Sequence, residues 1–472
     1  MMLTERRGFR LLLAGASTLP SGCLTSSIVS DVAELRARSG VAVLADVADA
    51  SVDPDPSEDA RALLREPLDA DTAVRVALLN NRMLRAQLRE LGVARGRLIQ
   101  ARQVANPLFE AEALPERNTA LELRVEYDIT SLVLAPLRAK AAAAELAAER
   151  LEVAGAVVQL GYDVRAAFHA LQSSRSRLVL AGRMLDVFAA GRDAATALLE
   201  AGSVPALDAS SRIAAFERAR VTVAQLELEV ADRRERLQRL LGLHARDTPW
   251  EVRAELPQVP DALPVPDAPE TRAIRASLEL AAMKSRLEAI AQRTRLSRTQ
   301  GWLPEIDVDL HSLHGDPSTG SGPRGPWRFG GGVALRVPLF DRQRGTTRAH
   351  EAEFDALMER YHGVAIDVRS AAREQRNRVV SAHARARQYQ KIIVPAQRRV
   401  VEQTQLQYNA MQVGVFQLLQ AHRDQLDIEL AYVETLREYW DATAALDALL
   451  AGRRVTLGTA ASTTDSVLPG GH

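Results

Sequence analysis

Two histidines stand three residues apart in the second half of the chain, and imidazole is among the common protein ligands of zinc. His311 falls on a predicted strand and His314 in the loop after it. A metal site needs three or four converging ligands with a supporting shell of hydrogen bonds, and no cysteine lies nearby in the sequence. The pattern therefore favours a solvated pair, and we expect no metal site and no cofactor.

The chain also lacks the local motifs that catalysis requires. The glycine-rich stretch 320–332 has no GxxxxGK[ST] pattern for phosphate binding, and it indicates an external loop. No Ser/His/Asp arrangement and no carboxylate pair has the sequence context that such sites need. We therefore expect no catalytic residue and no enzyme.

The single cysteine, Cys23, stands where a lipid could be attached. The basic segment 6–10 is followed by the apolar stretch 11–19 and the small residues 20–22, which is the layout of a secretory signal peptide. The site resembles the bacterial lipoprotein processing site, where the thiol takes a diacylglycerol, although Pro20 stands where leucine is usual. The alternative is an ordinary small residue near a cleavage site. Both interpretations predict export, and we expect Cys23 to be lipidated.

Composition limits the remaining classes of function. The 472 residues include 60 Lys or Arg and 60 Asp or Glu, so the formal net charge is zero, which disfavours binding to nucleic acid. Aromatic residues make up only 4%, and a sequence dominated by Ala, Leu, Glu and Arg is typical of long helices or coiled coils. No apolar run approaches the roughly 20 residues of a membrane-spanning helix. Any membrane crossing would therefore be made by strands.

A unit of helix, β-hairpin, long helix, break and shorter helix occurs twice along the chain. The period of roughly 200 residues is far longer than that of a solenoid repeat, so the pattern predicts one duplicated structural unit. Six segments follow from it: a signal peptide (1–22), an N-terminal lead-in (23–70), a first unit (71–243, hairpin 107–130), a Pro-rich equatorial insert (244–270), a second unit (271–452, hairpin 304–340) and a disordered C-terminal tail (453–472).

The long helices, predicted over 136–200 and 345–408, carry the spacing of a coiled coil. In the second of them, apolar residues from Phe354 to Val400 step by three and four, and Gln375 is the only polar member of the series. A 3.5-residue repeat sustained this long predicts a left-handed coiled coil, and about 65 residues span roughly 100 Å. Pro395 should kink its helix, because it removes one backbone hydrogen bond.

Each hairpin alternates polar and apolar side chains, so each predicted strand has two different faces. Open sheet edges are not tolerated in a bilayer, and about four strands from each of three identical chains would close a transmembrane barrel. A small soluble sheet with one solvated face is the alternative. The polar set, expected to line water, is Glu122, Arg124, Glu126, Glu305, Asp307 and Asp309; the apolar set, expected to face lipid, is Leu121, Leu123, Val125, Ile306, Val308 and Leu310.

The order of these elements resembles that of the TolC-type outer membrane factors over residues 70 to 452. The strand end 337–341 and the segment 408–421 carry the resemblance, and the segments 78–82 and 404–411 resemble more narrowly the heavy-metal-efflux branch. The resemblance implies an α+β, mainly α fold: a trimeric, twelve-stranded transmembrane β-barrel in the outer membrane, continued by a periplasmic α-helical coiled-coil barrel. It implies a passive exit duct of a tripartite efflux system, whose partners are a periplasmic adaptor and, indirectly, an inner-membrane pump.

The two helix breaks, 201–205 and 411–414, are expected to be periplasmic tips at the end away from the hairpins. Gly202 and Gly414 can adopt backbone angles that are closed to other residues, which suits a tight turn between helices. By resemblance, these tips should dock the adaptor.

The resemblance also implies a gate at the tips. The family's pattern of an aspartate on the first tip and a tyrosine on the second falls on Asp208 and Tyr408, while two further tip aspartates fall on Gln417 and Gln420 and an arginine on Val413. Amides offer a passing cation only dipoles, whereas carboxylates offer a net charge. We therefore expect weak cation selectivity at this ring, unless the constriction is made elsewhere.

Two other functions stay open from the sequence. A periplasmic adaptor lipoprotein also has long antiparallel helices and a lipidated cysteine, but it carries one helical hairpin flanked by β-rich domains. A structural coiled-coil lipoprotein without a pore would not need alternating strands. The exported substrate, whether metal ion, organic compound or polypeptide, does not follow from the sequence.

Overall fold

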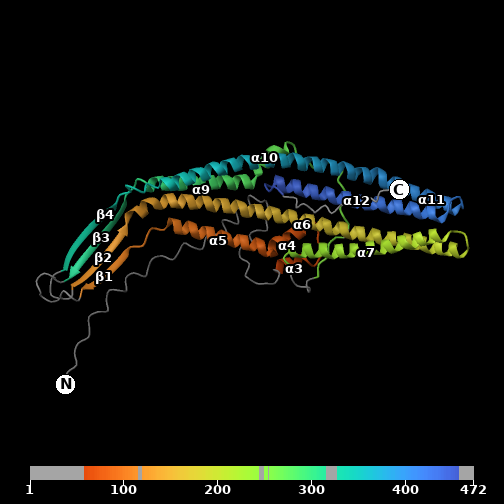
Figure 1. Ribbon diagram of the computed structural model, residues 1–472, viewed down its shortest axis with the longest axis horizontal. Coiled ribbons are helices and arrows are strands. Elements are labelled where there is room, and N and C mark those ends of the chain that lie inside the picture. Colours follow the sequence, from red (N-terminus) through yellow and green to blue (C-terminus); the bar gives the residue numbers. More distant parts are fainter. Residues whose placement is uncertain (1–57, 115–119, 244–248, 254, 315–326, 456–472) are drawn as a thin grey trace, which may run out of the picture.

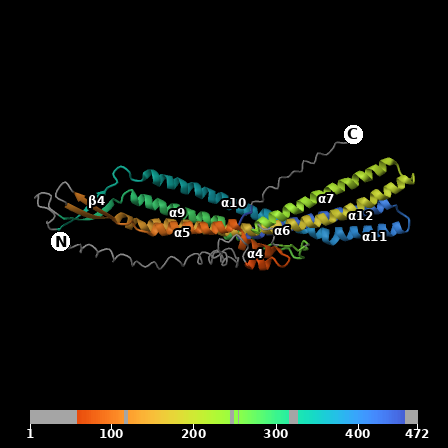
Figure 2. The same ribbon diagram turned by 90° about the horizontal axis from the view of Figure 1, so that it is seen from below.

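The chain forms a long helical rod with a small β-sheet at one end (Figures 1 and 2). The computed structural model describes residues 58–114, 120–243, 249–253, 255–314 and 327–455. Cys23, the predicted signal peptide and most of the predicted tail lie outside these residues. Most of the described chain is helical and a single four-stranded sheet is present among the described residues, so the predicted α+β, mainly α class is confirmed.

The predicted order of elements occurs twice. The first unit contains α3 (Glu58–Leu63), α4 (Ala70–Asn80), α5 (Arg82–Arg102), β1 (Leu108–Leu114), β2 (Ala120–Asp128), α6 (Ile129–Glu200) and α7 (Ala206–Leu240). The second contains α8 (Pro269–Ala276), α9 (Leu278–Gln300), β3 (Glu305–His314), β4 (Trp327–Arg336), α10 (Arg344–Gln388), a π-helical turn (Tyr389–Ile393), α11 (Val394–Asn409) and α12 (Val415–Leu450).

The helix that precedes each hairpin is broken once, where the sequence predicts a continuous helix. Asn81 separates α4 from α5, and its side-chain oxygen accepts a hydrogen bond from the Leu84 amide at 3.0 Å. Ser277 separates α8 from α9 and accepts from the Leu280 amide at 3.2 Å. Both residues cap a new helix with their own side chains, a local bond that competes with continuation of the preceding helix.

The helices lie side by side in an arc whose order changes halfway along the rod. Near the sheet the order is α5, α6, α9, α10, and near the far end it is α7, α6, α12, α11. The 72-residue helix α6 runs through both halves, a length of roughly 110 Å at 1.5 Å per residue. Ion pairs of Glu145 with Arg293 and of Glu152 with Arg286, spaced by seven residues on both helices, join α6 to the antiparallel α9.

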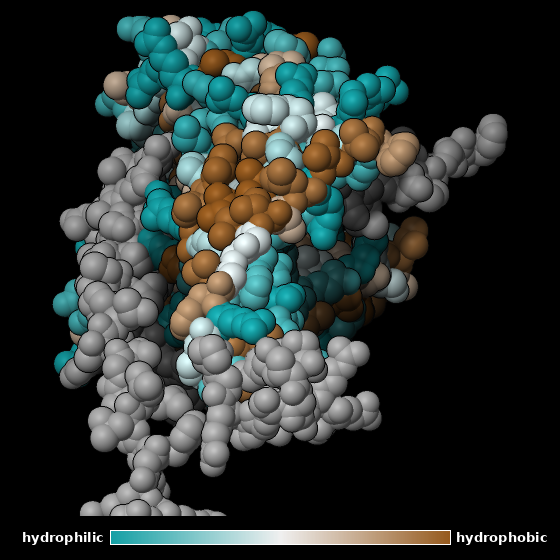
Figure 3. All heavy atoms as spheres, turned by 90° about the vertical axis from the view of Figure 1, so that its left-hand side faces the viewer, coloured by the Kyte–Doolittle hydropathy of each residue, from teal (hydrophilic) through white to brown (hydrophobic). Residues whose placement is uncertain are grey.

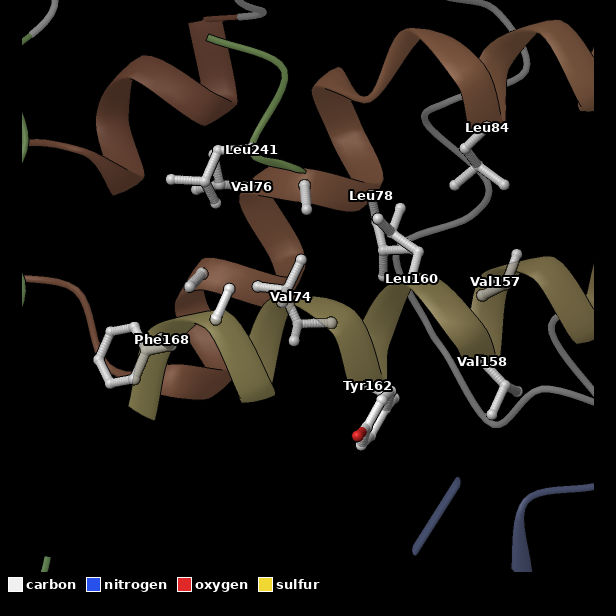
Figure 4. Close-up of a cluster of buried hydrophobic side chains, with 14 of the residues drawn as sticks. Val74, Val76, Leu78, Leu84, Val157, Val158, Leu160, Tyr162, Phe168 and Leu241 are labelled. Carbon is white, nitrogen blue, oxygen red and sulfur yellow. The ribbon is translucent and has the colours of Figure 1, made fainter. Parts of the chain in front are cut away.

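The main hydrophobic core lies at the middle of the rod, where α4 packs against α6 (Figure 4). Val76 and Leu78 of α4, Val157 and Phe168 of α6, and Leu241 beyond α7 are all almost completely buried. Each such side chain contributes about 1.5–3 kcal/mol when fully buried. This cluster therefore holds α4 against α6 at the middle of the rod.

A π-helical turn interrupts the second long helix and corrects the predicted heptad series. The Val394 amide donates to the carbonyl of Tyr389, five residues back, so this turn holds one residue more than an α-turn. Pro395 follows directly; its ring would clash with the carbonyl four residues earlier in a regular helix. Beyond the turn, Val394 and Val401 are buried at 8% exposure, whereas Val400, which the sequence predicts to be buried, is 48% exposed.

A belt crosses the outside of the rod between the two units (Figure 1). We define it as the described residues of 249–268. The Gln172 side-chain amide on α6 donates to the carbonyls of Arg253 and Glu255 at 2.8 and 2.9 Å, and the Trp440 indole on α12 donates to the carbonyl of Pro257 at 2.9 Å. The belt therefore ties the first unit to the second.

The belt also contacts α10 and the neighbouring π-turn. The imidazole Nε2 of His383 lies 2.9 Å from the carbonyl oxygen of Pro260, and the Lys391 ammonium lies 2.7 Å from the Asp261 carboxylate. The Lys391 hydrogen bond and charge hold the pKa of Asp261 below its usual value. Because this carboxylate is fully exposed, salt screens the pair.

The chain end packs on the rod more closely than the sequence predicts. Arg453 and Arg454 fall in the segment predicted to be a disordered tail. Arg454 instead pairs with Asp367 of α10 at 2.6 Å and with Glu279 of α9 at 3.4 Å. The second unit thus extends a few residues beyond its predicted boundary.

The buried side chain of His169 leads us to expect that the folding stability of the protein depends on pH. Its ring is 6% exposed, stacks on Trp440, and lies with Nδ1 3.2 Å from the Gln172 side-chain oxygen; burial lowers its pKa from the ordinary 6.5. A base whose folded-state pKa is depressed stays neutral in the fold while the unfolded chain takes up a proton. Its stabilising effect is therefore complete above about pH 6.5 and is lost as the pH falls below it.

Calorimetric melting of the purified protein between pH 7 and pH 5 tests this. We expect the midpoint to fall less in His169→Gln than in the wild type, while His362→Gln, at an exposed site on α10, follows the wild type. Parallel curves for all three proteins would contradict the prediction.

Candidate functional site

The sheet has one polar and one apolar face, as the alternation predicts. Its strand order is β1-β2-β3-β4, all antiparallel. Glu126 lies opposite Asp309 and Arg124 opposite His311, while Val125 lies opposite Leu310. Directly paired residues share a face of a sheet, so the six predicted polar residues all lie on one face and the six predicted apolar residues on the other. Figure 3, which looks onto this end, shows a continuous apolar patch surrounded by hydrophilic surface.

The register adds residues that the sequence analysis did not assign to this face. Glu110 pairs with Arg124, Glu112 with Glu122, and Asp128 with Asp307. The period-two alternation of Glu110 and Glu112 was the signal for them, and only the register places them. The polar face carries eight carboxylates and three arginines: Glu110, Glu112, Glu122, Glu126, Asp128, Glu305, Asp307 and Asp309 against Arg124, Arg328 and Arg336.

Glycines of β4 make room for two polar side chains of this face. A Cβ added at Gly330 would lie 2.4 Å from the His311 ring, and one at Gly332 would lie 2.4 Å from an Asp309 carboxylate oxygen. These two side chains therefore lie flat over β4, with His311 Nδ1 2.9 Å from Asp309. The sequence predicts a loop up to Gly332, but the chain is a strand from Trp327 onward. The glycines of this strand leave the space that the His311 and Asp309 side chains occupy.

The two helix breaks form matching turns at the end of the rod away from the sheet (Figure 1). In the first, Gly202 has φ 68° and the Ser203 amide donates to the Leu198 carbonyl at 2.8 Å. In the second, Met411 has φ 58° and the Gln412 amide donates to the Gln407 carbonyl at 2.9 Å. Both are Schellman turns with a left-handed residue after the helix.

The prediction for Gly414 is therefore wrong. It caps α12 with φ −81° and ψ 162°, an extended conformation open to any residue. The left-handed position of the second turn belongs to Met411, three residues earlier, whose side chain is 94% exposed. The predicted backbone conformation of Gly202 is confirmed, because this residue occupies the left-handed position of the first turn.

The predicted gate residues lie near the turns, on different helices. Asp208 is exposed in the first turn of α7, and Tyr408 is 38% exposed near the end of α11. The structure shows no hydrogen bond between these two described side chains within the chain, so their contact stays a prediction. Gln417 and Gln420 are both exposed on α12, with the buried Leu418 between them.

Carboxylates continue the stripe of Gln417 and Gln420. Asp424 and Asp427 are exposed one and two turns further along α12, and the Gln420 amide donates to Asp424 at 2.7 Å. At about 100° per residue, this stripe faces away from the side of α12 that contacts the belt through Trp440. Only the two glutamines were predicted from the sequence, although the spacing of Asp424 and Asp427 from Gln420 is visible there.

An arginine does link the two tips, at a position that the sequence analysis missed. The guanidinium of Arg212 on α7 lies 4.8 Å from the centre of the Phe416 ring on α12. Such a cation–π contact is worth about 0.5–1 kcal/mol at an exposed site. Val413, where the resemblance places the family's arginine, is half-buried.

In the part of the chain that the structure describes, no group of three or more His, Cys, Asp or Glu side chains could hold a metal ion. Likewise, none of the described helices is long and apolar enough to span a membrane.

Comparison with known proteins relates the chain to bacterial export channels. Residues 271–452 match the family described as "Outer membrane efflux protein". The chain is 24% identical over 394 residues to the cobalt-zinc-cadmium resistance protein CzcC of Cupriavidus metallidurans, covering 81% of this chain and 90% of that protein.

The fold is similar to that of solved outer-membrane channels. The channel OprN superimposes with a TM-score of 0.69 at 20% identity, over 87% of this chain and 96% of that chain. The Campylobacter jejuni channel CmeC superimposes with a TM-score of 0.66 at 14% identity, over 82% and 86% of the two chains.

The tip turns predict three different responses to substitution. Gly202→Ala should cost about 1–2 kcal/mol, because an L-residue is strained at a left-handed position. Met411→Gly should stabilise the protein by up to about 1 kcal/mol by removing that strain, and Gly414→Ala should be nearly neutral. Denaturant unfolding of the three variants measures these differences, and equal effects at Gly202 and Gly414 would show that the turn assignment is wrong.

Proposed function

We propose that this chain, whose residues 271–452 match the outer membrane efflux protein family, is the outer-membrane channel subunit of a tripartite efflux system. In this role it is a passive exit duct and not an enzyme. The inner-membrane pump supplies the energy, and the duct supplies a water-lined path out of the cell. The proposal includes a homotrimer anchored in the outer membrane and extending into the periplasm.

The two-faced sheet with two free edges carries this proposal. Among the described strands, β1 and β4 each pair on one side only, so each leaves a row of backbone donors and acceptors without strand partners there. In a bilayer such groups must be satisfied within protein, which a closed barrel achieves. Pairing β4 of one copy with β1 of the next would join three four-stranded sheets into twelve strands, within the usual range for outer-membrane barrels.

The chemistry of the two faces suits such a barrel. Phe329 is 83% exposed and Val333 64% exposed on the apolar face, where a lipid contact would remove them from water. The carboxylate-rich face would line the channel. In a narrow aqueous passage this surplus of negative charge favours cations over anions.

The helical rod would continue the channel toward the inner membrane. Its turns at 201–205 and 411–414 lie at the end away from the sheet (Figure 1), and we propose that they dock a periplasmic adaptor. We further propose that Cys23 carries a lipid anchor. An adaptor role for this chain itself is disfavoured, because the helical unit occurs twice and both hairpins join one sheet.

Divalent metal cations are the substrate class that we propose. The name of the related protein from Cupriavidus metallidurans refers to resistance to cobalt, zinc and cadmium. The acidic face of the sheet is compatible with passage of such ions. Specificity in this scheme would lie mainly with the pump and adaptor that load the duct.

The proposed function is tested by fractionation and by electrical recording. We expect the protein in the outer-membrane fraction as a trimer that separates into monomers on heating, and we expect the purified trimer to form ion-conducting channels in planar bilayers. A monomeric or non-conducting protein would overturn the proposal. Greater sensitivity of a deletion strain to cobalt, zinc and cadmium than to organic toxicants would support the proposed substrate class, and the reverse would contradict it.

The uncharged tip ring predicts weak block of this channel by multivalent cations added from the tip side. Gln417→Asp with Gln420→Asp should strengthen block by about tenfold or more, because three copies would place six carboxylates in a poorly screened constriction. The control is Asp424→Asn with Asp427→Asn, one and two turns deeper. Strong block in the wild type that this control abolishes would place the selective ring at the deeper aspartates instead.

The predicted contact of Tyr408 with Asp208 is tested on the same channel. A hydrogen bond to a carboxylate is worth about 1.5–3 kcal/mol, so Tyr408→Phe should raise the conductance of the closed state. Unchanged conductance in this variant would count against the contact.

A further inference from the structure

In the half of the rod away from the sheet, three phenylalanines each have the guanidinium of an arginine from another helix over the ring. The distances from guanidinium carbon to ring centre are 4.1 Å for Arg192–Phe216, 4.8 Å for Arg212–Phe416 and 4.6 Å for Arg423–Phe188. All three lie within the roughly 6 Å at which a cation is attracted to the face of an aromatic ring. We call these six residues the Arg–Phe cycle.

The three contacts join three helices in a closed cycle. The arginine of α6 meets α7, the arginine of α7 meets α12, and the arginine of α12 meets α6. Each helix therefore contributes one arginine and one phenylalanine. The first contact lies within the pair formed by α6 and α7, whereas the other two join that pair to α12, which packs on α11. The cycle thus connects the two helical hairpins that end in the tip turns.

The aromatic ring is the main partner of both arginines that connect the hairpins. Among the described residues, neither Arg212 nor Arg423 pairs with a carboxylate, whereas Arg192 is also bound to Asp193. The Nε of Arg423 is buried without a hydrogen-bond acceptor in the described part of the chain. Buried donors rarely lack a partner, and the negative face of the Phe188 ring supplies one here.

The two contacts made by α12 fix its rotation. Phe416 and Arg423 are seven residues apart, so at about 100° per residue they lie within about 20° of each other on one side of the helix. Phe416 meets α7 and Arg423 meets α6. The polar stripe that contains Gln420 and Asp424 is centred about 70° further round the helix. A rotation of α12 that moved this stripe would therefore break both contacts.

Arg423 also connects the cycle directly to the polar stripe. Its Nη1 donates to Oε1 of Gln420 at 3.3 Å, and the amide nitrogen of Gln420 donates to the carboxylate of Asp424 at 2.7 Å. Both ends of the Gln420 side chain are therefore engaged. The orientation of this amide follows from the position of the guanidinium, which in turn lies over the Phe188 ring.

We propose that the Arg–Phe cycle holds α12 at one rotation against α6 and α7 and thereby positions the polar stripe of α12. Its members on the two hairpins are positioning residues, because they act on the stripe and lie beside it. That the stripe lines a duct rests on the proposed function, whereas the hold on α12 is a property of the packing within one chain.

Thiol reactivity of the purified protein tests the hold on α12. Leu426 is 7% exposed and lies one turn beyond Arg423 on the same side of the helix, while Gln420 is exposed. Leu426→Cys should react with a water-soluble maleimide at least about tenfold more slowly than Gln420→Cys, because it reacts only when α12 moves away from α6. The wild type, which carries Cys23 alone, gives the background.

In the Leu426→Cys protein, Phe188→Leu should raise the rate of this reaction about two- to fivefold, the factor that corresponds to one exposed cation–π contact. Phe188→Tyr, which keeps the aromatic face, should leave the rate unchanged. The matched control is Phe216→Leu, which removes the contact between α6 and α7 without touching α12. When Arg423→Gln is already present, Phe188→Leu should have no further effect.

Several results would overturn the proposal. They are equal rates for Phe188→Leu and Phe188→Tyr, equal rates for Phe188→Leu and the control, and a full further increase in the presence of Arg423→Gln. If Leu426→Cys does not fold, Gly191→Cys on α6 reports on the same contact, because a Cβ there would lie 3.6 Å from Leu419 of α12. Labelling needs no conducting channel, so a non-conducting wild type would overturn the proposed function and leave this test intact.

Discussion

Each helix of this rod buries an apolar stripe against neighbouring helices of its own chain. Among the described residues, the helices at the two ends of the arc have such a neighbour on one side only. This constraint extends through the whole molecule. At one end of the rod it takes the form of two sheet edges with unpaired backbone groups, and along the rod it takes the form of exposed leucine, isoleucine and valine on the edge helices. At the sheet edges the free energy to be gained comes mainly from backbone hydrogen bonds, and on the edge helices it comes mainly from burial of apolar surface. In the proposed trimer, both would be relieved by the same event, the addition of further copies at both ends of the arc.

Duplication explains why the two tips are alike. Each tip turn has one residue at positive φ, followed by an amide that donates to the carbonyl five residues back. The chain departs from strict duplication at places that bear on the channel. Glycine in the left-handed position of the first turn is replaced by Met411 in the second, and the π-turn before Pro395 has no counterpart within the continuous helix α6. The second unit therefore has a more strained tip and a less regular rod.

The middle of the rod is held by polar contacts made to main-chain carbonyls of the belt. Gln172, Trp440 and His383 each place a side-chain nitrogen at hydrogen-bonding distance from a belt carbonyl. Because the carbonyls belong to the backbone, these contacts constrain the path of the belt more than its sequence. The exposed ion pair of Lys391 with Asp261 is weaker, since water and salt screen it. Attachment is thus firm on α6 and α12 and weaker next to the π-turn.

The sequence by itself determined the elements and their two-fold repetition, because periods of two and of three to four residues depend only on which side of a strand or helix is buried. It also determined which strand residues share a face, as Glu126 and Asp309 illustrate, since alternation is a local property. Tertiary structure decided the register that adds Glu110 and Glu112 to that face, because pairing joins strands that are distant in sequence. It placed the left-handed position at Met411 and not Gly414, because the hydrogen bonds of the finished turn select it. It also shifted the buried stripe from Val400 to Val401, because one extra residue in a π-turn rotates every later side chain about the helix axis.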